Sequence, residues 1–157
     1  MTAHSTSPAS ASARAPSTPD EWEAYFAARW EWLRAPLGQP PGSERDEYED
    51  TAVHRAVFGP EGDVLAIGRL HLVDAANARV RYVGCDPDHR CRGLGRVVMG
   101  ALEEAACRRN IRRIHLHARE DAVTFYIRLG YRATGAAPTL YGKIPQTMME
   151  KKLTPPA

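Results

Sequence analysis

The residues best suited to chemistry stand where a predicted strand ends and a long predicted helix begins. Two glycines, Gly93 and Gly95, let the backbone curl there, so that several amide N–H groups point into one concavity at the positive end of the helix dipole. Between residues 90 and 113 there are seven arginines against two acidic residues. The arginines that surround the glycines are Arg90, Arg92 and Arg96.

Backbone donors combined with arginine forks suit a diphosphate better than a single carboxylate. The spacing matches neither GxxxxGK(S/T) nor GxGxxG, which excludes the two common nucleotide-binding loops. We therefore predict a phosphate-binding turn of another kind.

Two segments together resemble those of a known enzyme family. Arg90–Gly95 is similar to the pattern (Q/R)-x-x-G-x-(G/A), and Ala122–Tyr131 is similar to A-x-x-F-Y-x-x-x-G-(F/Y). On these residues the chain resembles the GNAT superfamily of acyl-CoA-dependent N-acyltransferases. The chain is also similar to a small bacterial branch of that superfamily over about residues 20 to 153, on the segments Leu33–Gly38, Gly68–His71, Leu116–Arg119 and Met149–Leu153. The resemblance implies an α/β (α+β) fold with a mixed, mostly antiparallel sheet flanked by helices and splayed near Cys85.

The resemblance also implies a function. The protein is expected to be an N-acetyltransferase that moves an acetyl group from its cosubstrate acetyl-CoA to a primary amine by direct attack in a ternary complex. The alternative is a non-catalytic acyl-CoA-binding sensor module. A third hypothesis, a nucleic-acid-binding domain, is disfavoured because no aromatic residues alternate with the arginines.

The CoA contacts implied by the resemblance fall into three groups. The turn would hold the pyrophosphate, the end of the preceding strand would pair with the pantetheine arm, and a further arginine would contact pantetheine, an acidic acceptor or a neighbouring carboxylate. These residues are Val83, Gly84, Cys85, Arg90, Cys91, Arg92, Gly93, Leu94, Gly95, Arg96 and Arg119.

Acetyl transfer to an amine requires the movement of two protons. A lysine-like amine with a pKa of ~10.4 arrives protonated, and the departing thiolate needs an acid. The resemblance assigns the acid to Tyr126, whereas the alternative is a core tyrosine with a backbone partner. The strand 78–85 carries Arg79 and Arg81 but no carboxylate where many relatives have a glutamate. The candidate bases are therefore His71, Glu47, His117 and a water relay.

The elements that position these residues follow from the spacing of apolar side chains. Thr18-Pro19-Asp20-Glu21 predicts an N-cap and capping box for a helix that stops at Pro36. Its apolar stripe comprises Trp22, Phe26, Trp30 and Leu33. The acidic stretch 44–50 that follows predicts a solvated face or, alternatively, a wall that attracts a cationic substrate.

The rest of the chain predicts a mixed sheet. An antiparallel meander is expected from the strands Thr51–Phe58, Val64–Val73 and Ala78–Cys85. The amphipathic helix Gly93–Arg109 leads to a strand, Ile111–Ala118, that should lie parallel to the third strand. The helix Glu120–Leu129 and two short strands ending at Leu153 complete the fold.

Composition limits what else the chain can be. With 157 residues and a formal net charge of +2, one domain over 20–157 is expected, preceded by a disordered Ser/Ala/Thr/Pro-rich tail over 1–19. No apolar run approaches the roughly 18 residues that a membrane helix needs, and no secretory signal is visible. These features favour a cytoplasmic protein without a membrane partner. Three cysteines predict neither a metal site nor a disulfide framework. We expect no metal, no nucleic-acid partner, and a monomer or homodimer.

Overall fold

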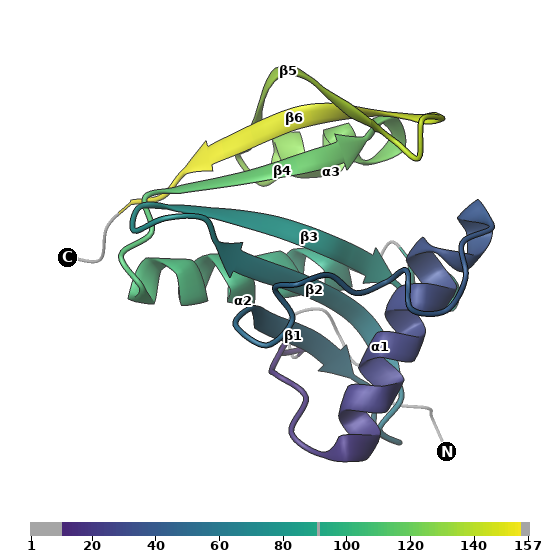
Figure 1. Cartoon of the computed structure of the whole chain (residues 1–157). Helices are drawn as coiled ribbons and strands as arrows, with labels where there is room; N and C mark the ends of the chain where they lie inside the picture. Colours follow the sequence, from purple (N-terminus) through teal and green to yellow (C-terminus); the bar gives the residue numbers. More distant parts are fainter. Residues whose placement is uncertain (1–10, 91, 155–157) are drawn as a thin grey trace. The chain divides into compact units, whose positions relative to one another are not determined.

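The computed structural model of the chain describes residues 11–90 and 92–154 (Figure 1). The α-helices in this part of the chain are α1 (Pro19–Leu33), α2 (Leu94–Arg108) and α3 (Val123–Arg128). The strands are β1 (Val53–Phe58), β2 (Val64–Leu72), β3 (Asn77–Cys85), β4 (Arg113–Arg119), β5 (Arg132–Leu140) and β6 (Ile144–Lys152). Hydrogen bonds join them into a six-stranded sheet of order β1-β2-β3-β4-β6-β5. This mixed sheet with helices confirms the predicted fold class.

The described residues group into two compact units. Unit 1 comprises those up to Arg69 together with Tyr82–Leu102, and unit 2 comprises Leu70–Arg81 together with those from Glu103 onward. β2, β3 and α2 contribute residues to both units. The prediction of one domain over 20–157 stays a prediction, and each unit is described by itself.

The helix α1 begins where the sequence predicts it. Thr18 is the N-cap, since its side chain accepts a hydrogen bond from the Glu21 amide at 3.1 Å, and Pro19 is the first helical residue. The Glu21 carboxylate does not close the capping box on Thr18. It accepts a hydrogen bond from the Ser17 amide at 2.8 Å and pairs with Arg14, which lowers the pKa of Glu21 to about 2.

The predicted disordered tail lies partly outside the described residues. In the described part, Arg14 forms an antiparallel bridge with Ala56 through backbone hydrogen bonds of 2.9 and 2.8 Å. The Arg14 guanidinium also lies 4.2 Å from the ring centroid of Phe58. Order therefore starts before Thr18, and the predicted boundary is wrong. The small side chains of this segment bury little surface, but Arg14 binds the Glu21 carboxylate and the Phe58 ring and so holds the segment in place.

The buried face of α1 differs from the predicted apolar stripe. Trp22 and Phe26 are only partly buried, whereas Tyr25 and Arg29, one helical turn apart, are completely buried. The polar groups of Tyr25 and Arg29 can be buried because the fold gives them hydrogen-bond partners.

The strands β1, β2 and β3 are neighbours in sequence order, as the predicted meander requires. β1 starts at Val53 instead of Thr51, because the amides of Thr51 and Ala52 donate to the Tyr48 carbonyl in a turn. The third strand starts one residue earlier than predicted, at Asn77.

The stretch Asn77–Asp86 contains one residue more than the stretch Leu65–Val73 that it faces. At one end of the hairpin the Val73 amide donates to the Asn77 carbonyl, and at the other the Asp86 amide donates to the Leu65 carbonyl. The extra residue is accommodated at Tyr82, whose φ of 60° lies in the left-handed region. Tyr82 therefore marks a bulge directly before the last residues of β3.

The helix α2 confirms the predicted amphipathic helix and packs against β2 at Gly68. A side-chain carbon at Gly68 would lie 2.6 Å from Cγ1 of Val98 and 3.0 Å from Cδ1 of Leu102. Val98 and Leu102 are fully buried. Only glycine permits this close approach of helix and strand.

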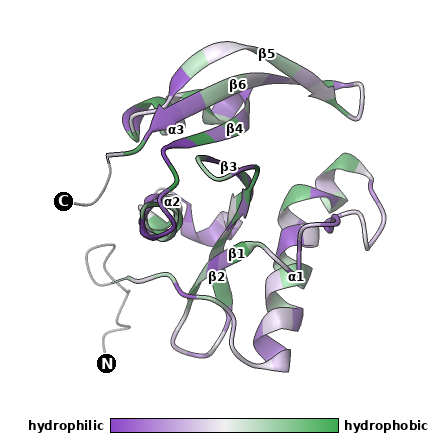
Figure 2. Ribbon diagram, turned by 60° about the vertical axis from the view of Figure 1, so that its left-hand side comes forward, coloured by the Kyte–Doolittle hydropathy of each residue, from purple (hydrophilic) through white to green (hydrophobic). Residues whose placement is uncertain are grey.

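In unit 2, β4 pairs with β3 in parallel, as predicted, with Asn77–Arg79 opposite Arg113–His115. β4 also pairs with β6 in antiparallel fashion. Buried and half-buried residues alternate along β4. Hydropathy alternates along the same strand, and Figure 2 shows it as green and purple segments of the ribbon. One face of β4 is therefore apolar and the other polar.

The C-terminal elements differ in detail from the prediction. The expected helix Glu120–Leu129 is divided into a 3-10 turn, Glu120–Ala122, and the α-helix α3, which begins at Val123. The two expected short strands, β5 and β6, have nine residues each, and β6 lies between β4 and β5. The register between β5 and β6 shifts near Gly135. Because of this irregularity, the side chains do not alternate regularly along the sequence, and the strand is hard to recognise.

Candidate active site

The predicted phosphate-binding turn follows the end of β3. The Asp86 carboxylate accepts a hydrogen bond from the Asp88 amide at 2.9 Å, which starts a 3-10 turn over Pro87–His89. Gly93 has a φ of 77°, in the region that glycine adopts readily, and α2 begins at the next residue. The first amides of α2 have no acceptor within the helix. Three arginines near these amides in the sequence have exposed side chains: Arg90, Arg92 and Arg96.

These features fit a diphosphate ligand. The backbone donors point from a helix N-terminus, and the exposed guanidiniums add charge that a dianion would neutralise. Cys91, which the resemblance also places against CoA, lies outside the described residues.

The last residues of β3, Val83–Cys85, are held by α1. A side-chain carbon at Gly84 would lie 3.3 Å from Cδ2 of Leu33 and 3.5 Å from Cε3 of Trp32. Gly84 thus lets the C-terminal end of α1 pack on the strand. Cys85 is half-buried, and its thiol lies 3.6 Å from the His89 carbonyl oxygen.

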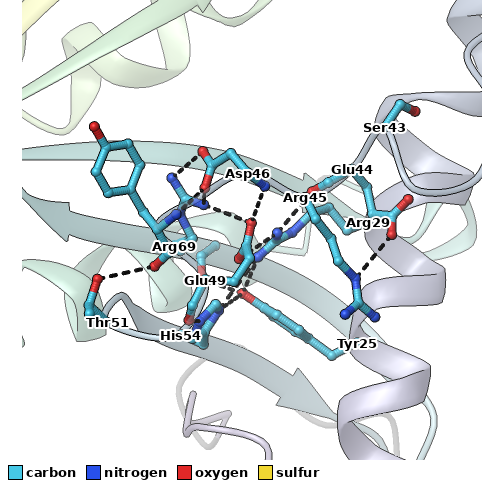
Figure 3. Close-up of polar contacts among 12 residues, drawn as sticks. Tyr25, Arg29, Ser43, Glu44, Arg45, Asp46, Glu49, Thr51, His54 and Arg69 are labelled. Carbon is cyan, nitrogen blue, oxygen red and sulfur yellow. Dashed lines mark hydrogen bonds and ion pairs between the residues drawn. The ribbon is translucent and has the colours of Figure 1, made fainter.

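Two fully buried arginines of unit 1 are paired with carboxylates from the acidic stretch (Figure 3). Arg69 donates to both carboxylate oxygens of Asp46, at 2.6 and 2.9 Å, and to Glu49 at 2.8 Å. Arg29 donates to the other oxygen of Glu49 at 2.9 Å and to the Glu44 carbonyl at 3.0 Å. Burial opposes the charge of Arg69, but Asp46 and Glu49 more than compensate and raise its pKa. We call Arg29, Asp46, Glu49 and Arg69 the buried ion network.

The ring of Tyr82 contacts the two arginines of this network and a third arginine, Arg34. Its centroid is 4.2 Å from the guanidinium carbon of Arg29, 4.9 Å from that of Arg69 and 5.2 Å from that of Arg34. A left-handed backbone at a non-glycine residue costs on the order of 1–3 kcal/mol. Contacts between a cation and an aromatic ring offset part of that cost. The buried ion network therefore helps to hold the bulge that precedes Val83–Cys85.

His54 joins the network as a neutral imidazole. Its Nε2 donates to the Glu49 carbonyl at 2.8 Å, and its Nδ1 accepts from the Tyr25 hydroxyl at 2.9 Å. Arg29 in turn donates to the Tyr25 hydroxyl at 3.0 Å. Burial, aided by the charge of Arg29, lowers the pKa of His54, and burial raises the pKa of Tyr25.

The structure divides the acidic stretch into two classes. Asp46 and Glu49 bind buried arginines, and Glu44 is buried with its carboxylate hydrogen-bonded to a backbone amide. The side chains of Glu47 and Asp50 are exposed. The prediction of a solvated face is therefore wrong for three of the five carboxylates, and the candidate base Glu47 is one of the two that face solvent.

The sequence analysis missed Arg29, Arg69 and Tyr82. A signal was present for the arginines, because Arg69 interrupts an apolar strand and Arg29 follows Tyr25 by one helical turn. A buried arginine requires an acidic partner, and the stretch 44–50 could supply it. Nothing in the residue types marks the backbone conformation of Tyr82.

Tyr126, the predicted acid, lies on α3 in unit 2 and is 8% exposed. Its ring makes edge contacts with Phe125 and Tyr131, with centroids 5.0 and 5.8 Å apart. Burial alone raises its pKa, with no hydrogen bond contributing among the described residues. The Tyr126 hydroxyl therefore remains protonated at neutral pH.

Tyr131 has a structural role beside it. Its hydroxyl donates to Glu103 at 2.9 Å, and Glu103 also pairs with Lys151 at 2.8 Å. Lys151 donates to the Leu129 carbonyl at 2.7 Å. These contacts hold the segment after α3, where the backbone turns at Gly130 with φ 97°.

Unit 2 also contains the other polar candidates. The candidate base His71 is buried on β2, and Arg119 ends β4 opposite Gln146. His117, another candidate base, accepts a hydrogen bond at Nδ1 from Arg79 at 3.1 Å. This bond occupies the lone pair of a neutral imidazole, so His117 cannot serve as a base in this arrangement.

Comparison with known proteins shows which family the chain belongs to. The model of the Acetyltransferase (GNAT) family matches residues 16–131. The chain belongs to this family. As a GNAT protein it is an acyl-CoA-dependent N-acyltransferase, and the predicted enzyme class is confirmed. An uncharacterized N-acetyltransferase of Bacillus subtilis (strain 168), YjcF, is 33% identical over 112 residues, which are 71% of this chain and 79% of that protein.

Solved structures show the same GNAT fold. A protein from Lactobacillus plantarum described as an N-acetyltransferase has a TM-score of 0.75 at 26% identity, over 87% of this chain and 94% of that one. An aminoglycoside 6'-N-acetyltransferase complexed with coenzyme A has a TM-score of 0.70 at 16% identity, over 89% and 94%. At that identity the second likeness shows the fold alone.

Residues 11–90 and 92–154 contain neither a candidate membrane helix nor a candidate metal cluster. No helix there is long and apolar enough to cross a membrane. No group of three potential metal ligands occurs among them.

Proposed function

We propose that this GNAT enzyme transfers the acetyl group of acetyl-CoA to a primary amine by direct attack in a ternary complex. The observation that carries the proposal is the turn between β3 and α2. It lies within the residues that the family model matches, resembles the family motif in sequence, has glycine in the left-handed conformation at Gly93, and contains three exposed arginines next to a helix N-terminus.

In this proposal the chain holds acetyl-CoA at two places. The amides and arginines from Arg90 to Arg96 bind the pyrophosphate, and the backbone of Val83–Cys85 pairs with pantetheine. Arg119 is a further contact to pantetheine. The buried ion network supports the second place, since it holds the bulge at Tyr82.

Tyr126 is proposed as the general acid. A thiol has an ordinary pKa of about 8.5, so a phenol with a raised pKa would not transfer its proton completely to the thiolate. Its contribution is a hydrogen bond to the sulfur as negative charge develops there. The raised pKa ensures that the hydroxyl carries its proton.

For the base, we retain His71 and Glu47 and exclude His117. If one of them accepts the amine proton, its replacement by glutamine removes the acidic limb of the pH profile of kcat/KM. A profile that keeps this limb in both variants favours proton loss through water.

The direct test is release of free thiol from acetyl-CoA in the presence of a panel of amines. For Tyr126→Phe we expect kcat to fall by about tenfold to a hundredfold, with the acetyl-CoA dissociation constant changed by less than about twofold. Tyr141→Phe, which alters an exposed tyrosine, is the matched control. Unchanged turnover in Tyr126→Phe would remove Tyr126 from the mechanism, and absence of thiol release with every amine would contradict the proposed function.

A further inference from the structure

One face of the sheet in unit 2 is lined with cationic and histidine side chains. On β3 and β4 the residues Ala78, Val80, Ile114 and Leu116 are buried. Because side chains alternate between the two faces of a strand, the residues between them point to the opposite face. Those residues, which we call the basic face, are Arg79, Arg81, His115 and His117.

The register brings the basic face together across the two strands. Arg79 is the register partner of His115 in the parallel pair. The hydrogen bond from Arg79 to Nδ1 of His117 spans the same strands. Since Nδ1 accepts, Nε2 carries the ring proton, and His117 presents an N–H donor.

The charges that act on His117 are positive. Burial first, then the charges of Arg79, Arg81 and His115, lower its pKa. On the other side, β6 places Met148 opposite His117.

The next positions of β6 on this face are Gln146 and Glu150. Gln146, opposite Arg119, is neutral. Glu150, opposite His115, binds Arg132 at 2.6 Å and Arg113 at 3.7 Å. The nearest carboxylate along β6 is thus shared with two other arginines.

We propose that the amine acceptor carries an anionic group, a carboxylate or a phosphate, which binds to the basic face. Arginine forks and a neutral imidazole N–H are donors suited to either group. The inference rests on the proposed function and narrows its acceptor from any primary amine to an amine with a negative charge. Arg79, Arg81 and His117 are then specificity-determining residues.

Matched pairs of amines test this inference. Lysine is compared with cadaverine, its counterpart without the carboxylate, and phosphoethanolamine with ethanolamine, by thiol release from acetyl-CoA. In at least one pair we expect the member that carries the anionic group to be preferred by about tenfold or more in kcat/KM. The pair that shows the preference identifies the anionic group. Equal or better turnover of both members that lack the anionic group, with measurable thiol release, would overturn the inference and leave the proposed function standing.

Variants locate the preference on the basic face. Arg81→Gln and Arg79→Gln should reduce it to about twofold or less, whereas Arg81→Lys should keep part of it. Arg113→Gln is the matched control, because Arg113 lies on the same face of β4 but pairs with Glu150. It should keep the full preference. A preference that survives in both glutamine variants contradicts the assignment.

A binding measurement decides the case in which no amine is turned over. Glutarate is titrated into the wild type and Arg79→Gln while the imidazole signals of His117 are followed by NMR. Saturable shifts in the wild type alone support an anion site. Inorganic phosphate is titrated in the same way, and absence of saturable shifts in the wild type with both anions overturns the anion site, whatever the fate of the proposed function.

Discussion

Two pairs of arginines in this protein differ in what surrounds them. Arg29 and Arg69 are completely buried in unit 1, and each donates to carboxylates that the chain itself supplies. Arg79 and Arg81 are half-buried on the basic face of unit 2, where a histidine is their neighbour and their charges act on it in the same direction.

The different surroundings distinguish two roles. Arg29 and Arg69 stabilise the fold, whereas Arg79 and Arg81 are proposed to bind the anionic group of a ligand. Buried cations need acidic partners, and the stretch 44–50 provides them. The carboxylates of that stretch lose contact with water when they bind the arginines. Positive charges gathered beside a neutral histidine instead favour an incoming anion. Burial and the sign of the neighbouring charge therefore predict different consequences for the same residue type.

The largest expected effect is loss of stability in the buried ion network. Arg69→Leu leaves Asp46 and Glu49 nearly buried without one of their cations, so the free energy of unfolding should fall by about 3–5 kcal/mol. Urea denaturation measures it.

The control is Arg108→Gln, which breaks an exposed helical pair with Glu104. It should cost less than about 0.5 kcal/mol. Similar losses in Arg69→Leu and Arg108→Gln would show that the buried network contributes no more than a surface pair.

Acidification should lower the free energy of unfolding by less than Arg69→Leu does. One histidine from each region, His54 and His117, should contribute to this effect. His54 and His117 have a pKa below the ordinary value of 6.5 in the folded protein. As the pH falls below about 6.5, the unfolded chain takes up protons that the folded chain does not, so the free energy of unfolding decreases.

Urea denaturation between about pH 7.5 and 5.5, where few carboxylates titrate, checks this expectation. His54→Gln and His117→Gln should each flatten the dependence. A wild-type stability that is constant or increases on acidification over this range contradicts it.

The smallest expected effect is on the titration of His117. Arg79→Gln and Arg81→Gln should each raise the pKa of His117 toward its ordinary value, because a positive neighbour is lost. NMR titration of the ring protons measures the change. Arg69→Lys, which keeps the charge of the other region, should leave the His117 pKa where it is, and a pKa that does not respond to Arg79 or Arg81 would remove the distinction between the two regions.

Much of the fold could be predicted from the sequence, because the signals are local. Thr18 and Pro19 start α1, glycines mark the turn before α2, and alternation in β4 follows from residue types alone. The family motifs predict the phosphate-binding turn for the same reason, since its chemistry lies in consecutive residues.

The remaining features depend on pairs far apart in the chain. Arg69 meets Asp46 and Glu49 only after β2 and the acidic stretch are folded together, and Arg14 joins Ala56 only at a strand edge. The left-handed Tyr82 depends on cations from two other elements. Such contacts have no period and no fixed spacing, so local patterns do not contain them.

The most direct test of the central claim is calorimetric titration with acetyl-CoA. Gly95 lies in the first turn of α2, and Gly100 lies on the same helix with open space around it. The wild type and Gly100→Leu should bind with the same affinity, whereas Gly95→Leu should bind at least about tenfold more weakly while remaining folded. Equal affinity in all three proteins would contradict a phosphate-binding turn at this helix N-terminus.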